Sequence, residues 1–237
     1  MASSLDESAF TFIALGGILQ EFRVAGQNIV LGFDAQRICQ YTPHISLDYR
    51  RTTTGYPGTV ELRVWHTAGK SYFNLGDGPT IEGTEAILAT DNYLPTDSTG
   101  IPISTIERYT STQVNKPFFL GATSPDIDDC FVVDTDPASI PADTRSRPLR
   151  LNAALRHLVT GIHLEVHSTE PAFQFYTGKY INIPSVGSAP ARGPRSGFCV
   201  EPSRYINAPN EPNWRGMSVL RKGQIWGSKI VYKAWKE

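Results

Sequence analysis

The sequence predicts an all-β protein, in which many short antiparallel strands form a β-sandwich or barrel. Apolar and polar residues alternate with a period of two in several segments, which is typical of strands with one buried face. Turn residues are dense, with 20 glycines and 17 prolines in 237 residues, and no segment carries an apolar stripe of helical period. Short strands separated by frequent turns favour this fold class over a helical one.

The alternation locates individual strands. In residues 158–167, Leu158, Ile162, Leu164 and Val166 are expected on one face of a strand. The same alternation, or a run of strand-forming residues, predicts the other strands, at 10–14, 18–25, 28–33, 59–66, 104–112, 148–154, 171–176, 197–201 and 227–235.

Two stretches, 134–147 and 183–196, are expected to be long loops between strands. Neither resembles a linker between domains, because the strands on both sides need partners. We therefore expect a single domain over residues 1–237.

Charge and cysteine content limit the function classes. The formal net charge is −1, from 22 basic and 23 acidic residues, and no run of like charge indicates nucleic acid or an anionic membrane as a partner. No apolar stretch has the length of a membrane span, and the N-terminus does not have the pattern of a leader. Three cysteines, Cys39, Cys130 and Cys199, have apolar neighbours and no metal-binding spacing, so we expect buried thiols in a reducing, cytoplasmic compartment.

Histidine and acidic side chains share one face of the predicted strand 158–167. His163, Glu165 and His167 lie at i, i+2 and i+4 and therefore project together. Two histidines in this pattern can bind zinc, but the pattern also describes the polar face of a half-buried strand, and no convincing fourth ligand is near. We expect no metal here and no cofactor elsewhere.

Three aspartates, Asp126, Asp128 and Asp129, precede an apolar run in the sequence PDIDDCFVV. They could bind calcium, but the ligand spacing of an EF-hand is absent. Taken alone, the segment is better interpreted as a turn with solvated acids.

Two further polar residues interrupt apolar strands. Gln174 lies between Phe173 and Phe175 and points away from both, so it either lines a surface or offers a donor and an acceptor to a polar ligand such as a sugar. Glu201 follows an apolar run, which Pro202 is expected to end. A carboxylate in that place is either turned to water or is a working acid–base group.

Taken together, these segments resemble the aldose 1-epimerase (galactose mutarotase) family. The resemblance is carried by seven motifs in the family's order, GYPGTVELRV (55–64), SYFNLGD (71–77), YLPTDSTGIP (93–102), DIDDCFVV (126–133), LEVHSTEPAFQFYTGKYI (164–181), GFCVEPSRYINAPNEPNW (197–214) and LRKGQIW (220–226). It covers nearly the whole chain. It implies a galactose mutarotase-like β-sandwich with an open cleft across one sheet.

The resemblance also implies roles for individual residues. The family's catalytic glutamate, which takes the proton from the anomeric hydroxyl, falls on Glu201. Its sugar-binding aspartate and glutamine fall on Asp128 and Gln174. Tyr72, in the SYFNL motif, is expected to contact the substrate.

The chain departs from the family where the acid should lie. The family's histidine before SYFNL, which protonates the ring oxygen, is replaced by Lys70. Lysine titrates near ~10.4, so Lys70 would need desolvation to act as an acid, and could instead stabilise a developing oxyanion. Tyr72 and His66 flank it as other candidates.

A second part of the family's site is also missing. The segment with the second histidine is absent from the 20 residues between LGFD and GYPG, and Arg37 is the candidate remnant of the family's arginine. The chain therefore resembles a shortened and diverged member.

The sequence leaves three functions open. The first is an isomerase of the aldose 1-epimerase type, acting on a cyclic hemiacetal such as a sugar, a lactol or a related oxygen-rich metabolite, with Glu201 as base. The second is a repurposed cleft that catalyses another isomerisation or cyclisation in the biosynthesis of a non-sugar metabolite. The third is a catalytically dead carbohydrate-binding protein. Each has a small-molecule ligand, and the sequence does not fix the oligomeric state.

Overall fold

The fold is given by a computed structural model, which describes residues 10–13, 18–31, 47–51, 60–64, 71–185 and 190–237. The described strands are β1 (Phe10–Ile13), β2 (Ile18–Val24), β3 (Gln27–Asn28), β4 (Leu47–Arg51), β5 (Val60–Val64), β6 (Thr84–Leu88), β7 (Asn92–Leu94), β8 (Glu107–Arg108), β9 (Phe118–Leu120), β10 (Asp128–Val132), β11 (Arg150–His157), β12 (Ile162–Ser168), β13 (Ala172–Tyr176), β14 (Cys199–Ser203) and β15 (Ile230–Lys236). The described residues contain no α-helix, only the 3₁₀ turns η3 (Pro137–Ser139), η4 (Ala208–Asn210) and η5 (Arg215–Met217).

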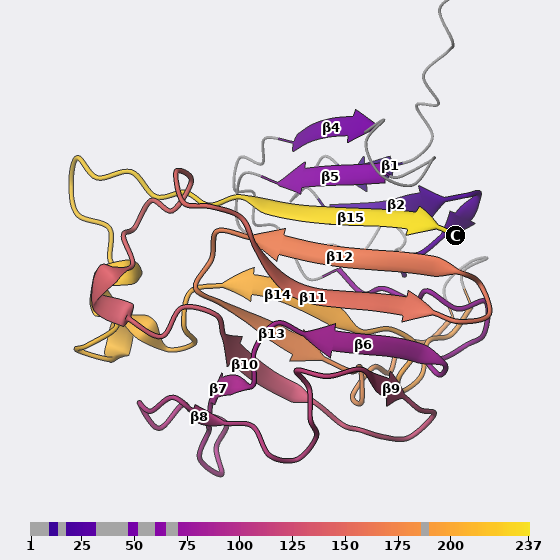
Figure 1. Ribbon diagram of the computed structural model, residues 1–237, viewed down its shortest axis with the longest axis horizontal. Helices are drawn as coiled ribbons and strands as arrows, with labels where there is room; N and C mark the ends of the chain where they lie inside the picture. Colours follow the sequence, from indigo (N-terminus) through magenta and orange to yellow (C-terminus); the bar gives the residue numbers. More distant parts are fainter. Residues whose placement is uncertain (1–9, 14–17, 32–46, 52–59, 65–70, 186–189) are drawn as a thin grey trace, which may run out of the picture.

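These strands form three antiparallel sheets (Figure 1). The largest has the order β4-β5-β15-β12-β11-β6-β9, the second β14-β13-β10-β7-β8, and the smallest β1-β2-β3. Neighbours in each order pair antiparallel, as in β10 with β13 and β13 with β14. The all-β prediction is therefore confirmed.

The two larger sheets pack face to face around an apolar core. Phe173 and Phe175 of β13 and Leu164 and Val166 of β12 are fully buried in the same cluster. Alternate residues of each strand thus face the partner sheet, and their neighbours face outward. The architecture is a β-sandwich, as the sequence predicted, and its seven-stranded sheet lies in front in Figure 1.

Two expectations about strand ends are wrong. Leu158 was expected in a strand but lies in the turn between β11 and β12, 55% exposed, where Gly161 adopts φ +67°. Pro202 was expected to end its strand but lies within β14, opposite Phe173. Because β14 is the last strand in its sheet order, the proline nitrogen can face away from β13 without removing a ladder hydrogen bond.

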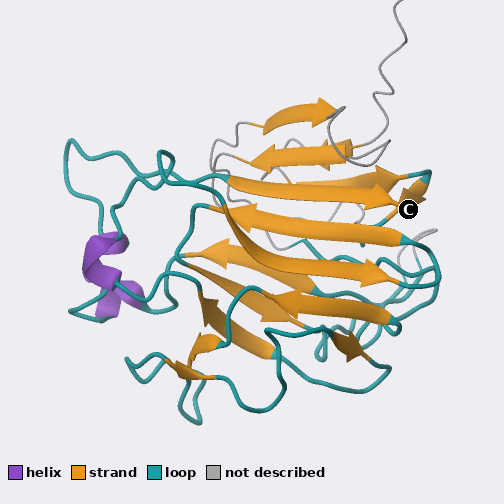
Figure 2. Cartoon of the chain, in the orientation of Figure 1, coloured by secondary structure: helices purple, strands orange, loops and turns teal. Residues whose placement is uncertain are grey.

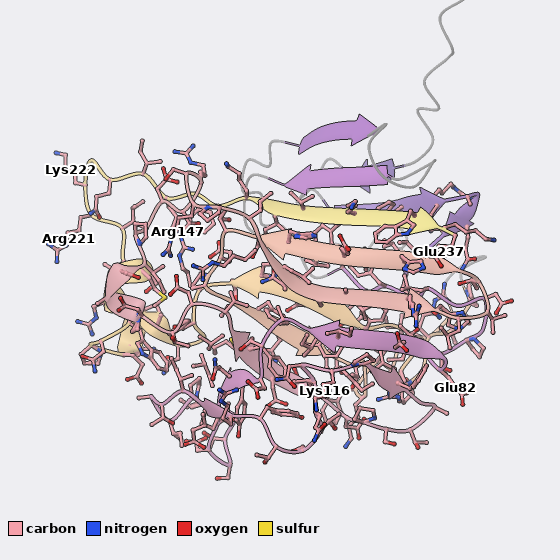
Figure 3. All side chains as sticks on the ribbon, in the orientation of Figure 1. Glu82, Lys116, Arg147, Arg221, Lys222 and Glu237 are labelled. Carbon is pink, nitrogen blue, oxygen red and sulfur yellow. The ribbon has the colours of Figure 1, made fainter. Side chains whose placement is uncertain are left out.

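A second apolar cluster covers one end of the outer face of the five-stranded sheet. Cys130 and Ala172 pack there with Trp214 and Met217. The 3₁₀ turns gather at this end of the molecule (Figure 2). The loop that follows them extends away from the sheets, with Arg221 and Lys222 at its far end (Figure 3).

A buried ion pair joins β14 to this end of the molecule. Arg204 is paired with Glu170, and their side chains are 9% and 3% exposed. Arg204 also donates hydrogen bonds to the carbonyl oxygens of Ala142, at 2.7 Å, and Met217, at 3.0 Å. Burial raises the pKa of Glu170 and lowers the pKa of Arg204, and the attraction between the two groups opposes both shifts.

Removing the cation of this pair is expected to be costly. Arg204→Met leaves the Glu170 carboxylate buried without its partner, and should lower the free energy of unfolding by about 3–5 kcal/mol in urea titrations. The control is Arg156→Met, whose side chain is 46% exposed beside Glu85 and whose loss should cost about 1 kcal/mol or less. Equal losses in the two variants would contradict a structural role for the buried pair.

Candidate functional site

The outer face of the five-stranded sheet carries the polar residues that the sequence singled out. Phe173 and Phe175 are fully buried in the core, whereas Gln174 and Tyr176 alternate with them and are partly exposed. Since side chains alternate across a strand, Gln174 and Tyr176 project together from the opposite face.

Glu201, Gln174 and Asp128 come together from three adjacent strands. Glu201 of β14 lies directly opposite Gln174 of β13. The Nε2 atom of Gln174 donates a hydrogen bond to Oδ1 of Asp128 on β10, at 2.8 Å. Directly opposite residues of an antiparallel pair have Cβ atoms about 4.5–5.5 Å apart. Residues far apart in the sequence thus place two carboxyl groups on either side of one amide.

The carbonyl oxygen of the Gln174 side chain lacks a hydrogen-bond donor among the described residues. Its Oε1 atom is buried and accepts no hydrogen bond from the part of the chain that the structure describes. A buried carbonyl oxygen without a donor is unfavourable.

A second row of side chains runs beside the first. Backbone hydrogen bonds of 2.8 and 2.9 Å pair Phe73 with Phe198, so Tyr72 lies opposite Cys199 in antiparallel register. Cys199 in turn lies opposite Tyr176. The row is completed by Asp128, which pairs with Tyr176 from the other side.

The two tyrosines of this row touch above the buried Cys199. The rings of Tyr72 and Tyr176 meet edge to face, with centroids 6.3 Å apart. Burial raises the pKa of Tyr72 to about 12, with smaller contributions from Cys199, Tyr176, Glu201 and Asp128. Burial likewise raises the pKa of Tyr176. Both phenols are therefore neutral near pH 7 and can donate hydrogen bonds.

The three aspartates of the PDIDDCFVV segment have different roles. Only Asp128 joins the site. Asp126 forms ion pairs with Lys179, at 3.0 Å, and Arg195, at 3.2 Å. Asp129 alternates to the other face of β10, where burial raises its pKa. Asp126 precedes β10, and the pleat of β10 turns Asp128 and Asp129 to opposite faces of the sheet.

Two predicted site residues, Lys70 and Arg37, lie outside the described residues. The same holds for Cys39. Cys130 and Cys199 are buried free thiols, as the sequence predicted.

The histidine pair lies on the opposite side of the molecule. His163 stacks on Trp235, with ring centroids 4.9 Å apart, and His167 lies 3.0 Å from Glu165. His163, Glu165 and Trp235 border a depression of about 360 Å³ on the outer face of the seven-stranded sheet, which Glu85 also lines. Among the described residues, no group of three His, Cys, Asp or Glu side chains is arranged to hold a metal ion. No helix in the described ranges is long and apolar enough to cross a membrane.

The sequence was compared with known families and proteins. The family described as Aldose 1-epimerase matches residues 64–233. The bifunctional protein GAL10 of Pachysolen tannophilus is 34% identical over 215 residues, which cover 76% of this chain and 29% of the relative. Mouse galactose mutarotase is 30% identical over 208 residues, 76% of this chain and 58% of the relative. The chain belongs to the aldose 1-epimerase family. The matched region spans 29% of the length of the first of these relatives and 58% of the second.

A solved structure supports the fold of this chain independently of the sequence comparisons. The GalM/aldose epimerase homologue from C. elegans superposes with a TM-score of 0.60 at 15% identity, over 97% of this chain and 79% of that structure. At that identity the likeness concerns the fold alone. The resemblance seen in the sequence is confirmed at the level of the family and of the galactose mutarotase-like sandwich.

Two residues of the candidate site, Tyr176 and Cys199, are not predicted as site residues from the sequence. The sequence predicts Tyr176 only as a strand residue and Cys199 only as a buried thiol. The alternation along each strand could have indicated them. Tyr176 is two residues from Gln174, and Cys199 is two residues from Glu201, so each pair shares a face of its strand. What the sequence could not supply was the pairing that makes Cys199 and Tyr176 neighbours.

Close packing at one glycine positions Tyr72. A Cβ atom at Gly197 would lie 2.6 Å from Cδ1 of Leu31 and 3.1 Å from Cβ of Tyr72. Gly197→Ala should therefore lower the free energy of unfolding by about 1–3 kcal/mol and alter the near-UV circular dichroism of the tyrosines. Gly193→Ala is the control, because a Cβ atom there meets nothing within 4 Å. A Gly197→Ala variant as stable as Gly193→Ala, with an unchanged spectrum, would contradict this packing.

Proposed function

We propose that this chain is an isomerase that interconverts the anomers of a cyclic hemiacetal, with Glu201 as the base. The observation that carries the proposal is the placement of Glu201, Gln174 and Asp128 on one sheet face in a member of the aldose 1-epimerase family. Galactose is the first substrate to test, because the mouse relative is named a galactose mutarotase. Lactols and related oxygen-rich metabolites are the wider class.

The chemistry needs a base on the anomeric hydroxyl. Glu201 removes that proton while the bond from the anomeric carbon to the ring oxygen breaks, and a free aldehyde forms. Rotation about the neighbouring C–C bond and reclosure give the other anomer. Gln174 and Asp128 would hold sugar hydroxyls, since an amide and a carboxylate together accept and donate hydrogen bonds. Proton transfers of this kind need no redox group, so we propose a reaction without a cofactor.

Three broader features belong to the same proposal. We propose that residues 1–237 act as one domain and that the partner is a small molecule. We also propose a cytoplasmic location, which the buried free thiols Cys130 and Cys199 support, because unpaired cysteines are typical of reducing compartments.

Glu201→Gln tests the base directly. The amide keeps the size of the side chain but cannot take a proton, so the rate of mutarotation of α-galactose, followed by polarimetry, should fall about 10²-fold or more. Glu165→Gln is the matched control, because Glu165 lies on the outer face of the other sheet. Full activity in Glu201→Gln would overturn the assignment. A wild-type chain that binds galactose but does not mutarotate it would instead support a carbohydrate-binding protein.

Lys70 is expected not to replace the family's histidine as the acid. A lysine would need a pKa about 2–3 units lower to donate its proton near pH 7. Lys70→Met should therefore leave the rate within about tenfold of wild type, and Lys70→His should not lower it. The measurement is again polarimetry. Loss of activity in Lys70→Met, with unchanged thermal unfolding, would identify Lys70 as the acid.

A further inference from the structure

The ring oxygen also needs a proton when the hemiacetal opens, and this chain has a lysine where the family has its acidic histidine. Tyr176 lies on the same sheet face as Glu201, in the neighbouring strand. Its hydroxyl oxygen accepts a hydrogen bond from the backbone N–H of Tyr180, at 2.6 Å. A phenol that accepts at its oxygen keeps its own proton for donation. The hydrogen bond and the contact with the Tyr72 ring together fix the hydroxyl.

The spacing between Tyr176 and Glu201 suits an acid and a base acting on one hemiacetal. Tyr176 pairs with Cys199, two residues before Glu201, so Tyr176 and Glu201 are diagonal neighbours. The Cα atoms of such neighbours lie about 7–8 Å apart, which is within reach of aromatic and long side chains. Both side chains also project from the same face of the sheet, so the phenol and the carboxylate can contact one small ligand.

The acidity of a tyrosine is adequate for this leaving group. Burial raises the pKa of Tyr176, so the phenol stays protonated at neutral pH. The ring oxygen that leaves as an alkoxide is far more basic, about as basic as hydroxide, whose conjugate acid has a pKa of ~15.7. Proton transfer from phenol to alkoxide is therefore downhill. The Tyr180 N–H that donates to the phenol oxygen would stabilise the tyrosinate that remains.

We propose that Tyr176 is the acid that protonates the ring oxygen, an inference that rests on the proposed anomerase function. Glu201 takes the proton of the anomeric hydroxyl, and that electron pair forms the C=O bond. The bond between the anomeric carbon and the ring oxygen breaks, and its electron pair takes the proton of Tyr176. After rotation, tyrosinate takes the proton back, the ring oxygen attacks the other face of the aldehyde, and Glu201 returns its proton. Nothing is oxidised or reduced.

Tyr176→Phe removes the proton and keeps the ring. The kcat for α-galactose, measured by polarimetry, should fall about 10²-fold or more while KM changes little, because the acid acts in the transition state. Tyr93→Phe is the matched control, because it removes a phenol oxygen from β7 of the same sheet, where Tyr93 packs against the core side. Tyr72→Phe should cost less than Tyr176→Phe.

A second variant separates acid catalysis from a structural effect. Tyr176→3,5-difluorotyrosine lowers the phenol pKa at nearly constant shape, so the alkaline limb of the pH–rate profile should move to lower pH. An unmoved limb, a Tyr176→Phe variant within about tenfold of wild type, or a larger loss in Tyr72→Phe would each overturn the role of Tyr176 while Glu201→Gln remains inactive. If wild type itself mutarotates neither galactose nor glucose, the proposed function fails, and the acid assignment fails with it.

Discussion

The site depends on the pleat of one central strand, β13, which is hydrogen-bonded on both sides. Phe173 and Phe175 are fixed in the core between the two sheets, so Gln174 and Tyr176 must project from the other face. A slip of one residue would place the amide in the core and a phenylalanine in the site. The hydrophobic energy that holds the sandwich together therefore also fixes the register of the polar groups.

Pairing with the neighbouring strands converts this alternation into a two-dimensional array. Glu201 is opposite Gln174, and Asp128 and Cys199 are on either side of Tyr176. The second apolar cluster bounds this array at one end. There Trp214 and Met217 pack against Cys130 and Ala172 on the outer face of the five-stranded sheet. The buried pair of Arg204 and Glu170 holds the chain just after β14, the strand that carries Glu201.

The strands found from the sequence were those with β-branched or aromatic residues in alternation, such as β12 and β15. Two segments that the sequence misjudged have a weaker signal. β6 reads TEAIL, in which glutamate and alanine have weak strand preference, and pairing with β11 decides its conformation. The predicted strand 104–112 is reduced to the two residues of β8. Local preference is too small to decide such segments without their partners.

The sequence by itself determined the family, which follows from ordered motifs. It also determined the all-β sandwich and the alternation of Gln174 and Glu201 with the apolar residues beside them, which follow from a period of two along single strands. Only the tertiary structure decided that Tyr176 and Cys199 join the site, that Asp128 enters it while Asp129 does not, and that His163 lies on another sheet. The physical reason is that hydrogen-bonded register brings together residues whose separation in the sequence carries no information about their distance in space.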